Sequence, residues 1–194
     1  DSALNAHRIA KHPWFHPFMR CKAPRMPIFR AFKKRKMKPG MKILETGCGR
    51  GEFLRVFKGL GMDAVGLDRS EESRELLSEY AIESAVCDVE SDAGLPFPDN
   101  SFDSIVTFQV IEHIKDDDLF VREIKRILRP GGIALMTTPN IKMTLTRNPW
   151  HIREYTADEL TSLCQKYFDD VEMKGVAGNQ KVMEYYERNK ASVK

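Results

Sequence analysis

The stretch ILETGCGRGEF (residues 43–53) predicts a β-strand that passes through a glycine-rich turn directly into a helix. Three glycines stand at alternate positions of the turn, Gly47, Gly49 and Gly51. Because glycine has no Cβ, the chain can turn sharply with positive φ there, and a ligand can lie directly on the backbone. The stretch therefore indicates a ligand-binding turn at the carboxyl end of a strand.

Beyond residue 41, short β-like runs alternate with helical patterns, which is typical of βαβ units and a parallel sheet. We expect strands at 41–46, 63–68, 84–88, within 101–111, at 132–139 and at 170–175. Helices are expected after Gly51 up to Gly59, from Ser70 to about Tyr80, over 116–128, and from Thr156 to Phe168. The segment 181–190 has the pattern of a helix rather than of a seventh strand. The predicted fold class is α/β, a Rossmann-like three-layer sandwich with a mostly parallel sheet of six or seven strands.

The composition is that of a globular protein with one folded domain, expected over residues 39–194. Apolar residues make up 42% and charged residues 30% of the 194 positions. The longest apolar runs are far shorter than the roughly 20 residues that span a bilayer, and no signal-peptide pattern opens the chain. The four cysteines show no C-x-x-C spacing, so we expect reduced thiols and a cytoplasmic location.

The net charge of +3 is unevenly distributed. Residues 1–42 hold twelve Lys or Arg and one acid, whereas the rest holds nineteen bases and twenty-seven acids. We predict that residues 1–38 form a basic N-terminal helical arm in which five aromatic residues alternate with the bases: Trp14, Phe15, Phe18, Phe29 and Phe32. This composition favours peripheral contact with an anionic membrane or with an acidic, partly apolar substrate. Alternatively, the aromatics pack on the body as a lid while the bases face water.

Three acids are expected along the carboxyl edge of the sheet, where open α/β folds bind ligands. Glu45 precedes the first glycine, and Asp68 and Asp88 end the second and third predicted strands. These acids would repel a triphosphate, and the Lys-Ser/Thr of a P-loop is absent after the glycines. A ligand with an ammonium group, a sulfonium and a ribose diol fits better, and S-adenosylmethionine has all three. A nicotinamide-binding domain remains an alternative for the glycines, and helix capping for the aspartates.

With these residues the chain resembles the class I S-adenosylmethionine-dependent methyltransferase superfamily. The resemblance covers roughly residues 41–175 and includes three further blocks: CDVE (87–90), FPDNSFDSIVTFQVIEHI (97–114) and LRPGG (128–132). It is most similar to the branch that contains quinone-biosynthesis methyltransferases and bacterial small-molecule and glycan O-methyltransferases. It implies S-adenosylmethionine as the cofactor and methyl transfer as the reaction.

The resemblance assigns the methionine part of the cofactor to the glycine turn. The backbone of Gly47, Cys48 and Gly49 would hold it, and Glu45 would order the turn and reach the ammonium group through hydrogen bonds. The end of the fourth strand would border the methionine part and the path of the methyl group, through Phe108 and Gln109. Cys48 is interpreted as a small residue of the turn rather than as a nucleophile.

The same resemblance assigns the nucleoside to the next two strand ends. Asp68 would bind the ribose hydroxyls through two charge-assisted hydrogen bonds. Asp88 would accept from the adenine amino group, and Val89 would lie against the ring. Gly51 and Arg69 complete the expected cofactor-binding set.

Two histidines are candidates for a general base at the acceptor. His151 lies in NPWHIREY (148–155), a region that in this fold commonly crosses the mouth of the site, and it is preferred over His113. A structural role remains open for both. The fourth strand ends in TFQV (107–110) and lacks the Asn/Asp-Pro-Pro-aromatic motif of enzymes that methylate amino groups of nucleic-acid bases.

No metal site is expected. His7, His12, His16 and Cys21 are candidate ligands, but Pro13 and Pro17 interrupt the helical face that they would need. The sequence thus predicts a methyltransferase for a small-molecule or lipid-linked acceptor, with oxygen as the favoured target and no nucleic-acid partner. Two alternatives remain open: a nucleic-acid methyltransferase or binder, and a non-catalytic module that binds S-adenosylmethionine.

Overall fold

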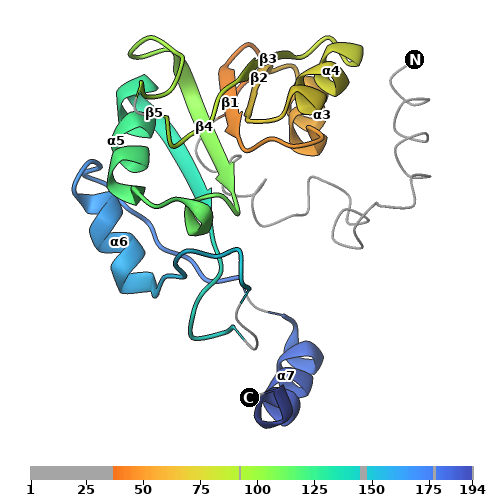
Figure 1. Ribbon diagram of the computed structural model, residues 1–194, viewed down its shortest axis with the longest axis vertical. Coiled ribbons are helices and arrows are strands. Elements are labelled where there is room, and N and C mark those ends of the chain that lie inside the picture. Colours follow the sequence, from red (N-terminus) through yellow and green to blue (C-terminus); the bar gives the residue numbers. More distant parts are fainter. Residues whose placement is uncertain (1–36, 92, 145–147, 177, 194) are drawn as a thin grey trace.

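The computed structural model describes residues 37–193 except 92, 145–147 and 177 (Figure 1). The predicted arm, residues 1–38, lies almost entirely outside the described residues, so its helical character stays a prediction. The described part is an α/β fold in which a central sheet separates two helical layers. This confirms the predicted fold class.

The sheet has five parallel strands in the order β3-β2-β1-β4-β5. They are β1 (Lys42–Thr46), β2 (Asp63–Asp68), β3 (Glu83–Val86), β4 (Phe102–Phe108) and β5 (Leu128–Thr137). In register, Glu45 of β1 lies opposite Gly66 of β2 and Val106 of β4. Because all strands run the same way, the segments that follow them meet at one edge of the sheet.

The helices cover both faces of the sheet (Figure 1). On one face lie α3 (Glu52–Gly59) and α4 (Glu71–Glu79), and on the other lie α5 (Asp117–Ile127) and α6 (Ala157–Gln165). The short 3₁₀ helix η3 (Ile111–His113) follows β4, and α7 (Gln180–Val193) ends the described chain. Helix α7 confirms the helical pattern expected at 181–190.

Each face of the sheet has its own hydrophobic core. Neighbouring residues of a strand point to opposite faces, and accordingly Ile43 packs with Leu54 and Phe57 of α3, whereas Leu44 belongs to the core that includes Phe120 and Ile124 of α5. All six of these residues are buried. The two cores fix β1 from both sides and thereby the position of the glycine turn that follows it.

The predicted start of α6 is confirmed by its capping box. The side chain of Thr156 accepts from the N–H of Glu159, and the Glu159 carboxylate accepts from the N–H of Thr156. The backbone hydrogen bond from Thr156 lowers the pKa of Glu159. Ser70 also precedes its helix as expected, but its side chain makes no capping hydrogen bond.

The expected count of six or seven strands was wrong, because residues 170–175 do not form a strand. The apolar residues that suggested a strand there, Val171 and Met173, remain partly exposed. A strand with no buried apolar face and no neighbour to pair with has little to stabilise it. Another difference concerns β5, which begins at Leu128, directly after α5, although the strand was expected at 132–139.

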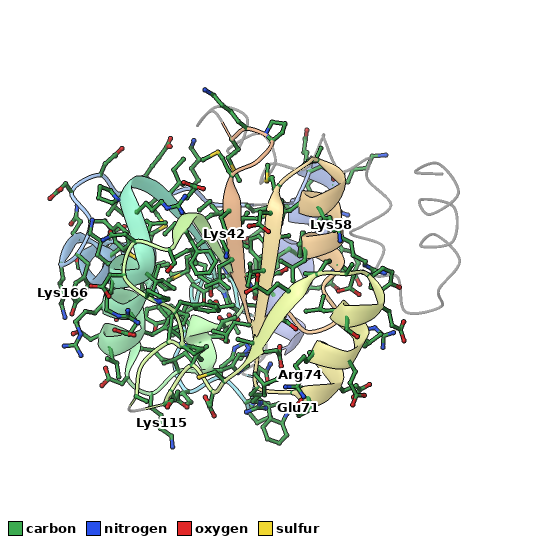
Figure 2. All side chains as sticks on the ribbon, turned by 90° about the horizontal axis from the view of Figure 1, so that it is seen from above. Lys42, Lys58, Glu71, Arg74, Lys115 and Lys166 are labelled. Atoms are coloured by element: carbon green, nitrogen blue, oxygen red, sulfur yellow. The ribbon has the colours of Figure 1, made fainter. Side chains whose placement is uncertain are left out.

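Charged side chains lie at the periphery of the described body, and the sheet passes through its middle (Figure 2). Glu71 and Arg74 of α4 form an ion pair on this surface, with both side chains more than half exposed. Exposed pairs of this kind contribute only about 0.2–1 kcal/mol. Within the described residues, no helix combines the length and the apolar character needed to cross a membrane.

Candidate functional site

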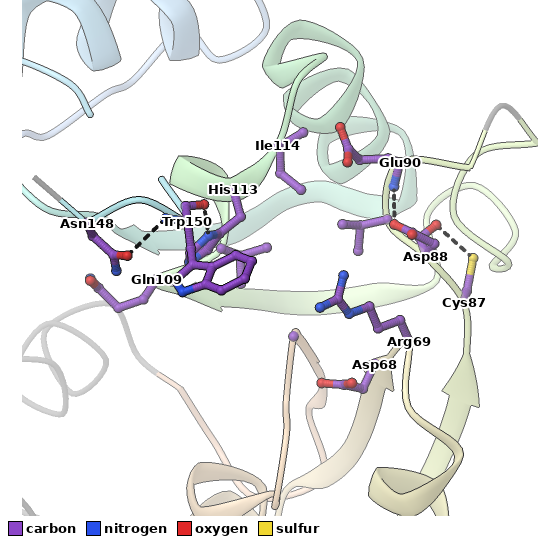
Figure 3. Close-up of a pocket in the computed structure, with 13 residues that line it drawn as sticks. Asp68, Arg69, Cys87, Asp88, Glu90, Gln109, His113, Ile114, Asn148 and Trp150 are labelled. Carbon is purple, nitrogen blue, oxygen red and sulfur yellow. Dashed lines mark hydrogen bonds between the residues drawn. The ribbon is translucent and has the colours of Figure 1, made fainter. Parts of the chain in front are cut away.

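A cavity of about 540 Å³ opens at the carboxyl edge of the sheet (Figure 3). It is bordered by the turns after β1, β2, β3 and β4 and by residues 148–150. Seven of the expected site residues line it: Gly47, Asp68, Arg69, Asp88, Val89, Gln109 and His113. The remaining six, which are not among its lining residues, are Glu45, Cys48, Gly49, Gly51, Phe108 and His151.

At Gly47, the glycine turn leaves no room for a side chain. Gly47 has a φ of 63°, and a Cβ there would lie 2.6 Å from Val110 Cγ2. The N–H of Cys48 donates to the carbonyl of Leu67 at 3.1 Å, which ties the turn to β2. The backbone at Gly47 is consequently the part of the turn that a ligand in the cavity can approach.

Asp68 anchors the same turn from the end of β2. Its Oδ2 accepts from the N–H of Gly49 at 2.8 Å, and its Oδ1 accepts from the N–H of Ser70 at 3.0 Å. The carboxylate also faces the cavity. Since each carboxylate oxygen has two lone pairs, Asp68 can accept further hydrogen bonds from a ligand while it holds the turn.

Glu45 lies behind the turn, only 3% exposed. Its Oε2 has no hydrogen-bond partner among the described residues. Burial, followed by the negative charges of Glu52 and Asp68, raises the pKa of Glu45 well above its ordinary value. A cationic group bound nearby would stabilise the ionised form of this carboxylate.

Cys48 is buried beside these acids. Burial, together with the charges of Glu45 and Asp68, raises the pKa of the Cys48 thiol to about 12. Because only the thiolate is an effective nucleophile, this environment agrees with a packing role for Cys48 in the turn.

The turn after β3 brings Asp88 and Val89 to the cavity. Asp88 lies on the far side of the cavity from His113 (Figure 3). Asp88 Oδ1 accepts from the N–H of Glu90 at 3.0 Å, which fixes the bend of the chain. Val89 packs against the core that contains α5. An acid and an apolar side chain therefore stand next to each other at this end of the cavity.

At the end of β4, two neighbouring residues point to different places. Phe108 packs on Phe53 of α3, with ring centroids 4.6 Å apart. Gln109 has a φ of 56°, donates its N–H to the carbonyl of Thr137, and lines the cavity. The positive φ turns the chain so that Gln109, and not Phe108, faces the cavity.

The two histidines lie together, with ring centroids 5.0 Å apart, but only His113 lines the cavity. His113 Nδ1 lies 2.8 Å from the carbonyl oxygen of Trp150. The side chain of His151 is 12% exposed, and its Nδ1 lies 2.7 Å from Oε1 of Glu154. His113 is therefore the one that a ligand in the cavity can touch, and His151 is not among the lining residues.

Three residues near this end had no assigned role in the sequence analysis: Asn148, Trp150 and Glu154. Trp150 is 79% exposed and lines the cavity beside His113 (Figure 3). All three belong to the NPWHIREY segment, in which an acid follows His151 by three residues. An acid so close to a candidate base was the signal that could have identified Glu154.

Comparison with known proteins places this arrangement in a family. The family described as "Methyltransferase domain" matches residues 44–136, which run from β1 to the end of β5. A probable S-adenosylmethionine-dependent methyltransferase of Mycolicibacterium smegmatis is 38% identical over 141 residues, which are 69% of this chain and 53% of that protein. The ubiquinone biosynthesis O-methyltransferase of Mesorhizobium japonicum is 36% identical, over 52% of this chain and 42% of the relative.

The chain thus spans only about half the length of the curated relatives it matches. A solved structure of a Pyrococcus horikoshii protein has the same fold, with a TM-score of 0.64 and 22% identity over 78% of this chain and 83% of that one. The glycine turn, the acids at the strand ends and these matches agree. The chain belongs to the class I S-adenosylmethionine-dependent methyltransferase superfamily, whose cofactor is S-adenosylmethionine.

Proposed function

We propose that this chain transfers the methyl group of S-adenosylmethionine to a hydroxyl group of a small-molecule or lipid-linked acceptor. The observation that carries the proposal is the cavity that joins two acids, Asp68 and Asp88, to the imidazole of His113. The acid-lined end suits the cofactor's nucleoside, and the end with His113 and Trp150 suits an acceptor. The cofactor contributes an activated methyl group on a sulfonium.

The residues present fit this cofactor. Gly47 offers bare backbone to the methionine part, and the buried carboxylate of Glu45 behind it favours a nearby ammonium group. In this arrangement Asp68 binds the ribose hydroxyls with its remaining lone pairs. Asp88 accepts from the adenine amino group while Val89 lies against the ring.

The reaction asks little covalent chemistry of the protein. S-adenosylmethionine, held by the backbone at Gly47 and by Asp68 and Asp88, would supply the methyl group to the acceptor oxygen and would leave as S-adenosylhomocysteine. The acceptor oxygen loses its proton, and the nitrogen of His113 that faces away from Trp150 is placed to take it. Much of the acceleration comes from holding the two reactants in line, and a base adds to it.

Two further observations support an acceptor that contains a flat ring and is itself a lipid or is attached to one. The exposed indole of Trp150 offers a flat apolar surface at the acceptor end of the cavity. The relative from Mesorhizobium japonicum is an O-methyltransferase of ubiquinone biosynthesis. A cytoplasmic location with peripheral membrane contact through residues 1–38 fits the same proposal.

Calorimetry tests the cofactor half of the proposal. S-adenosylmethionine and S-adenosylhomocysteine should bind, and NAD and ATP should not. At a ligand concentration of about a hundred times the Kd, S-adenosylhomocysteine should stabilise the fold by about 2.7 kcal/mol. A stronger response to NAD than to S-adenosylhomocysteine would contradict the proposal.

The acceptor half is tested with methyl-labelled cofactor and separated lipid, glycan, small-molecule and nucleic-acid fractions. Label in an alkali-stable ether of a lipid or small molecule is the expected result. Label in RNA or DNA would replace the proposal with a nucleic-acid methyltransferase. Cofactor binding without label in any fraction would favour a non-catalytic module.

A further inference from the structure

Three metal-ligating side chains come together at the acceptor end of the cavity, although the sequence suggested no metal there. Glu112, His113 and His151 each offer one ligand atom, and the three atoms all lie within 4.8 Å of one another. Glu112 and His113 belong to η3, and His151 is brought to them by the segment before α6. Backbone hydrogen bonds from Ile152 and Arg153 to the Glu112 carbonyl hold that segment in place.

Glu112 is a buried carboxylate with a free oxygen. Its side chain is fully buried, and its Oε2 accepts from the Thr138 hydroxyl at 3.0 Å. The other oxygen, Oε1, is buried and has no partner among the described residues. A buried carboxylate oxygen without a partner is costly unless something binds it.

Both histidines are held in the way that metal-binding histidines are. His113 places Nδ1 2.8 Å from a backbone carbonyl, and His151 places Nδ1 2.7 Å from the Glu154 carboxylate. An acceptor of this kind fixes the proton on Nδ1 and leaves the lone pair on Nε2, the usual support for a histidine that binds a metal through its other nitrogen. Glu154 is itself held by a hydrogen bond from Thr144.

We propose that Glu112, His113 and His151 bind one divalent transition-metal ion at the acceptor end of the cavity. Two imidazoles and one carboxylate are a known ligand set of catalytic Zn²⁺, and they suit Fe²⁺ and Co²⁺ as well. Mg²⁺, which prefers oxygen ligands, is excluded by the two nitrogen ligands.

The site needs a small adjustment to close around an ion. Bonds of about 2.0–2.1 Å in a tetrahedral arrangement hold ligand atoms roughly 3.4 Å apart, so the three atoms draw together by up to about 1.4 Å. The Asn148 amide, whose Nδ2 lies 3.0 Å from His151 Nε2, turns aside as the ion takes that lone pair. His113 lines the cavity, so the fourth coordination position faces the acceptor.

The role of the ion rests on the proposed function, whereas its binding does not. An acceptor hydroxyl at the open position is fixed in place and loses its proton more readily, as a water bound to Zn²⁺ does. The ion then takes over the task that His113 has in its absence. A proton-removing ion beside the methyl group suits an oxygen acceptor in particular.

The test is a Zn²⁺ titration of the purified, metal-free full chain against a chromophoric chelator, with Co²⁺ absorption as a second readout. The background variant carries His7→Asn, His12→Asn and His16→Asn, which leaves His113 and His151 as the only histidines. It should still bind one equivalent of Zn²⁺, and the bound ion should protect both remaining imidazoles from carbethoxylation. Loss of the bound equivalent in this variant, or failure to protect the imidazoles, overturns the proposal.

Substitutions within that background identify the ligands. Glu112→Gln or His113→Asn should remove the bound equivalent, and Glu154→Gln should weaken Zn²⁺ binding by about 10–100-fold. Glu79→Gln, at an exposed position of α4, is the matched control and should bind as before. Undiminished binding in both Glu112→Gln and His113→Asn overturns the proposal.

S-adenosylhomocysteine binding separates this inference from the proposed function. It is measured in parallel with chelator present. Retained cofactor binding in the variants shows that they are folded. If the cofactor binds and Zn²⁺ does not, the metal site is wrong and the methyltransferase proposal stands. If Zn²⁺ binds and the cofactor does not, the metal site stands and the methyltransferase proposal is wrong.

Discussion

Asp68 holds the glycine turn, and in the proposed function the same carboxylate also binds the ribose, so its removal should affect both stability and cofactor binding. Asp68→Ala removes the acceptors for the N–H groups of Gly49 and Ser70 and the proposed contacts to the ribose. Charge-assisted hydrogen bonds contribute about 1.5–3 kcal/mol each, so S-adenosylhomocysteine should bind at least tenfold more weakly. The melting temperature of the ligand-free protein should fall as well, because the turn loses its anchor.

The Asp68→Asn variant separates the two tasks. Its amide keeps one acceptor oxygen, so it should retain more of the melting temperature than Asp68→Ala while cofactor affinity still falls. Calorimetry and a thermal melt on the same samples measure both quantities. Unchanged affinity in Asp68→Ala would show that the ribose binds elsewhere.

Glu45 gives the ligand-free protein a stability that depends on pH. Its pKa is raised in the folded state, so the folded protein holds this proton more tightly than the unfolded chain does. The stabilisation is complete below the ordinary Glu value of about 4.3 and is lost as the pH rises through the raised pKa. Each tenfold gain in proton affinity on folding corresponds to about 1.4 kcal/mol of this stabilisation. Glu45→Gln carries no such proton.

We therefore expect the free energy of unfolding of Glu45→Gln, relative to the unmodified chain, to grow as the pH rises from 4 to 8. Urea denaturation at several pH values without cofactor measures it. The exposed substitution Glu79→Gln serves as the control and should show a nearly constant difference. A difference that is also constant for Glu45→Gln would mean that this carboxyl is ionised as easily in the fold as in water.

The cavity-lining residues at the strand ends could be predicted from the sequence, whereas those in the long loops could not. Glycines and acids directly after β-like runs identified Gly47, Asp68 and Asp88, because a strand end fixes where the next side chain goes. Trp150 contacts His113 across 37 positions of chain. No local pattern encodes that meeting, which depends on how residues 148–156 lie over η3.

At the scale of elements, helix α3 has a glycine at each end. The conformation before its first residue requires glycine, whereas its last residue can be replaced by alanine. Gly51 has a φ of 68°, and a Cβ there would overlap Leu77 Cδ2 of α4. Gly59 ends the same helix with ordinary φ, and a Cβ added there would meet no atom within 4 Å. Gly51→Ala should lower the free energy of unfolding by about 1–3 kcal/mol through overcrowding, with backbone strain in addition.

Gly59→Ala is the matched control in the same helix. It should raise the free energy of unfolding by up to about 1 kcal/mol, because alanine loses less conformational freedom than glycine. Urea denaturation of both variants measures the difference. Equal effects of the two substitutions would show that Gly51 does not lie against the Leu77 side chain.

Helices and strands whose apolar face packs on a core were predicted well. The strand expected at 170–175 was not observed, and this segment has no neighbouring strand among the described residues. Helix α5 and strand β2 were expected within one residue of their observed bounds because each has a regular apolar pattern that packs on a core. Residues 170–175 alternate apolar and charged side chains just as a strand does, yet they find no neighbouring strand. Pairing is a property of the assembled sheet, so local alternation alone overestimated the strand count.

At the scale of the whole molecule, the strand order creates the site. From β1 the chain moves outward to β2 and β3, then crosses back to β4 and β5 on the other side. The turns after β1 and β4 therefore lead to opposite faces of the sheet and leave a space between them, where open α/β folds bind ligands. The proposed cofactor and acceptor ends of the cavity correspond to the two halves of the sheet.

The charge of the whole chain is divided between a basic N-terminal arm and an acidic body, and this suggests a role for the arm. Residues 1–36 hold ten bases and one acid, and removing them leaves 21 bases and 27 acids, a net charge of −6. An acidic body is repelled by an anionic membrane, whereas each Lys or Arg near such a surface contributes about 1 kcal/mol of attraction. We propose that the arm brings the cavity to an anionic or membrane-held acceptor.

Deletion of residues 1–36 tests this role and spares Met37, which packs on the core beside α3. Cofactor affinity should stay within about threefold, a difference below 1 kcal/mol. Turnover of a lipid-linked acceptor should fall, and co-sedimentation with anionic liposomes should be lost. Sedimentation of the full chain should itself weaken at high salt, because the Debye length shrinks from about 10 Å at 0.1 M to 3 Å at 1 M. Equal sedimentation of both forms would remove the membrane contact, and a deletion that also abolished cofactor binding would make the arm a structural cap.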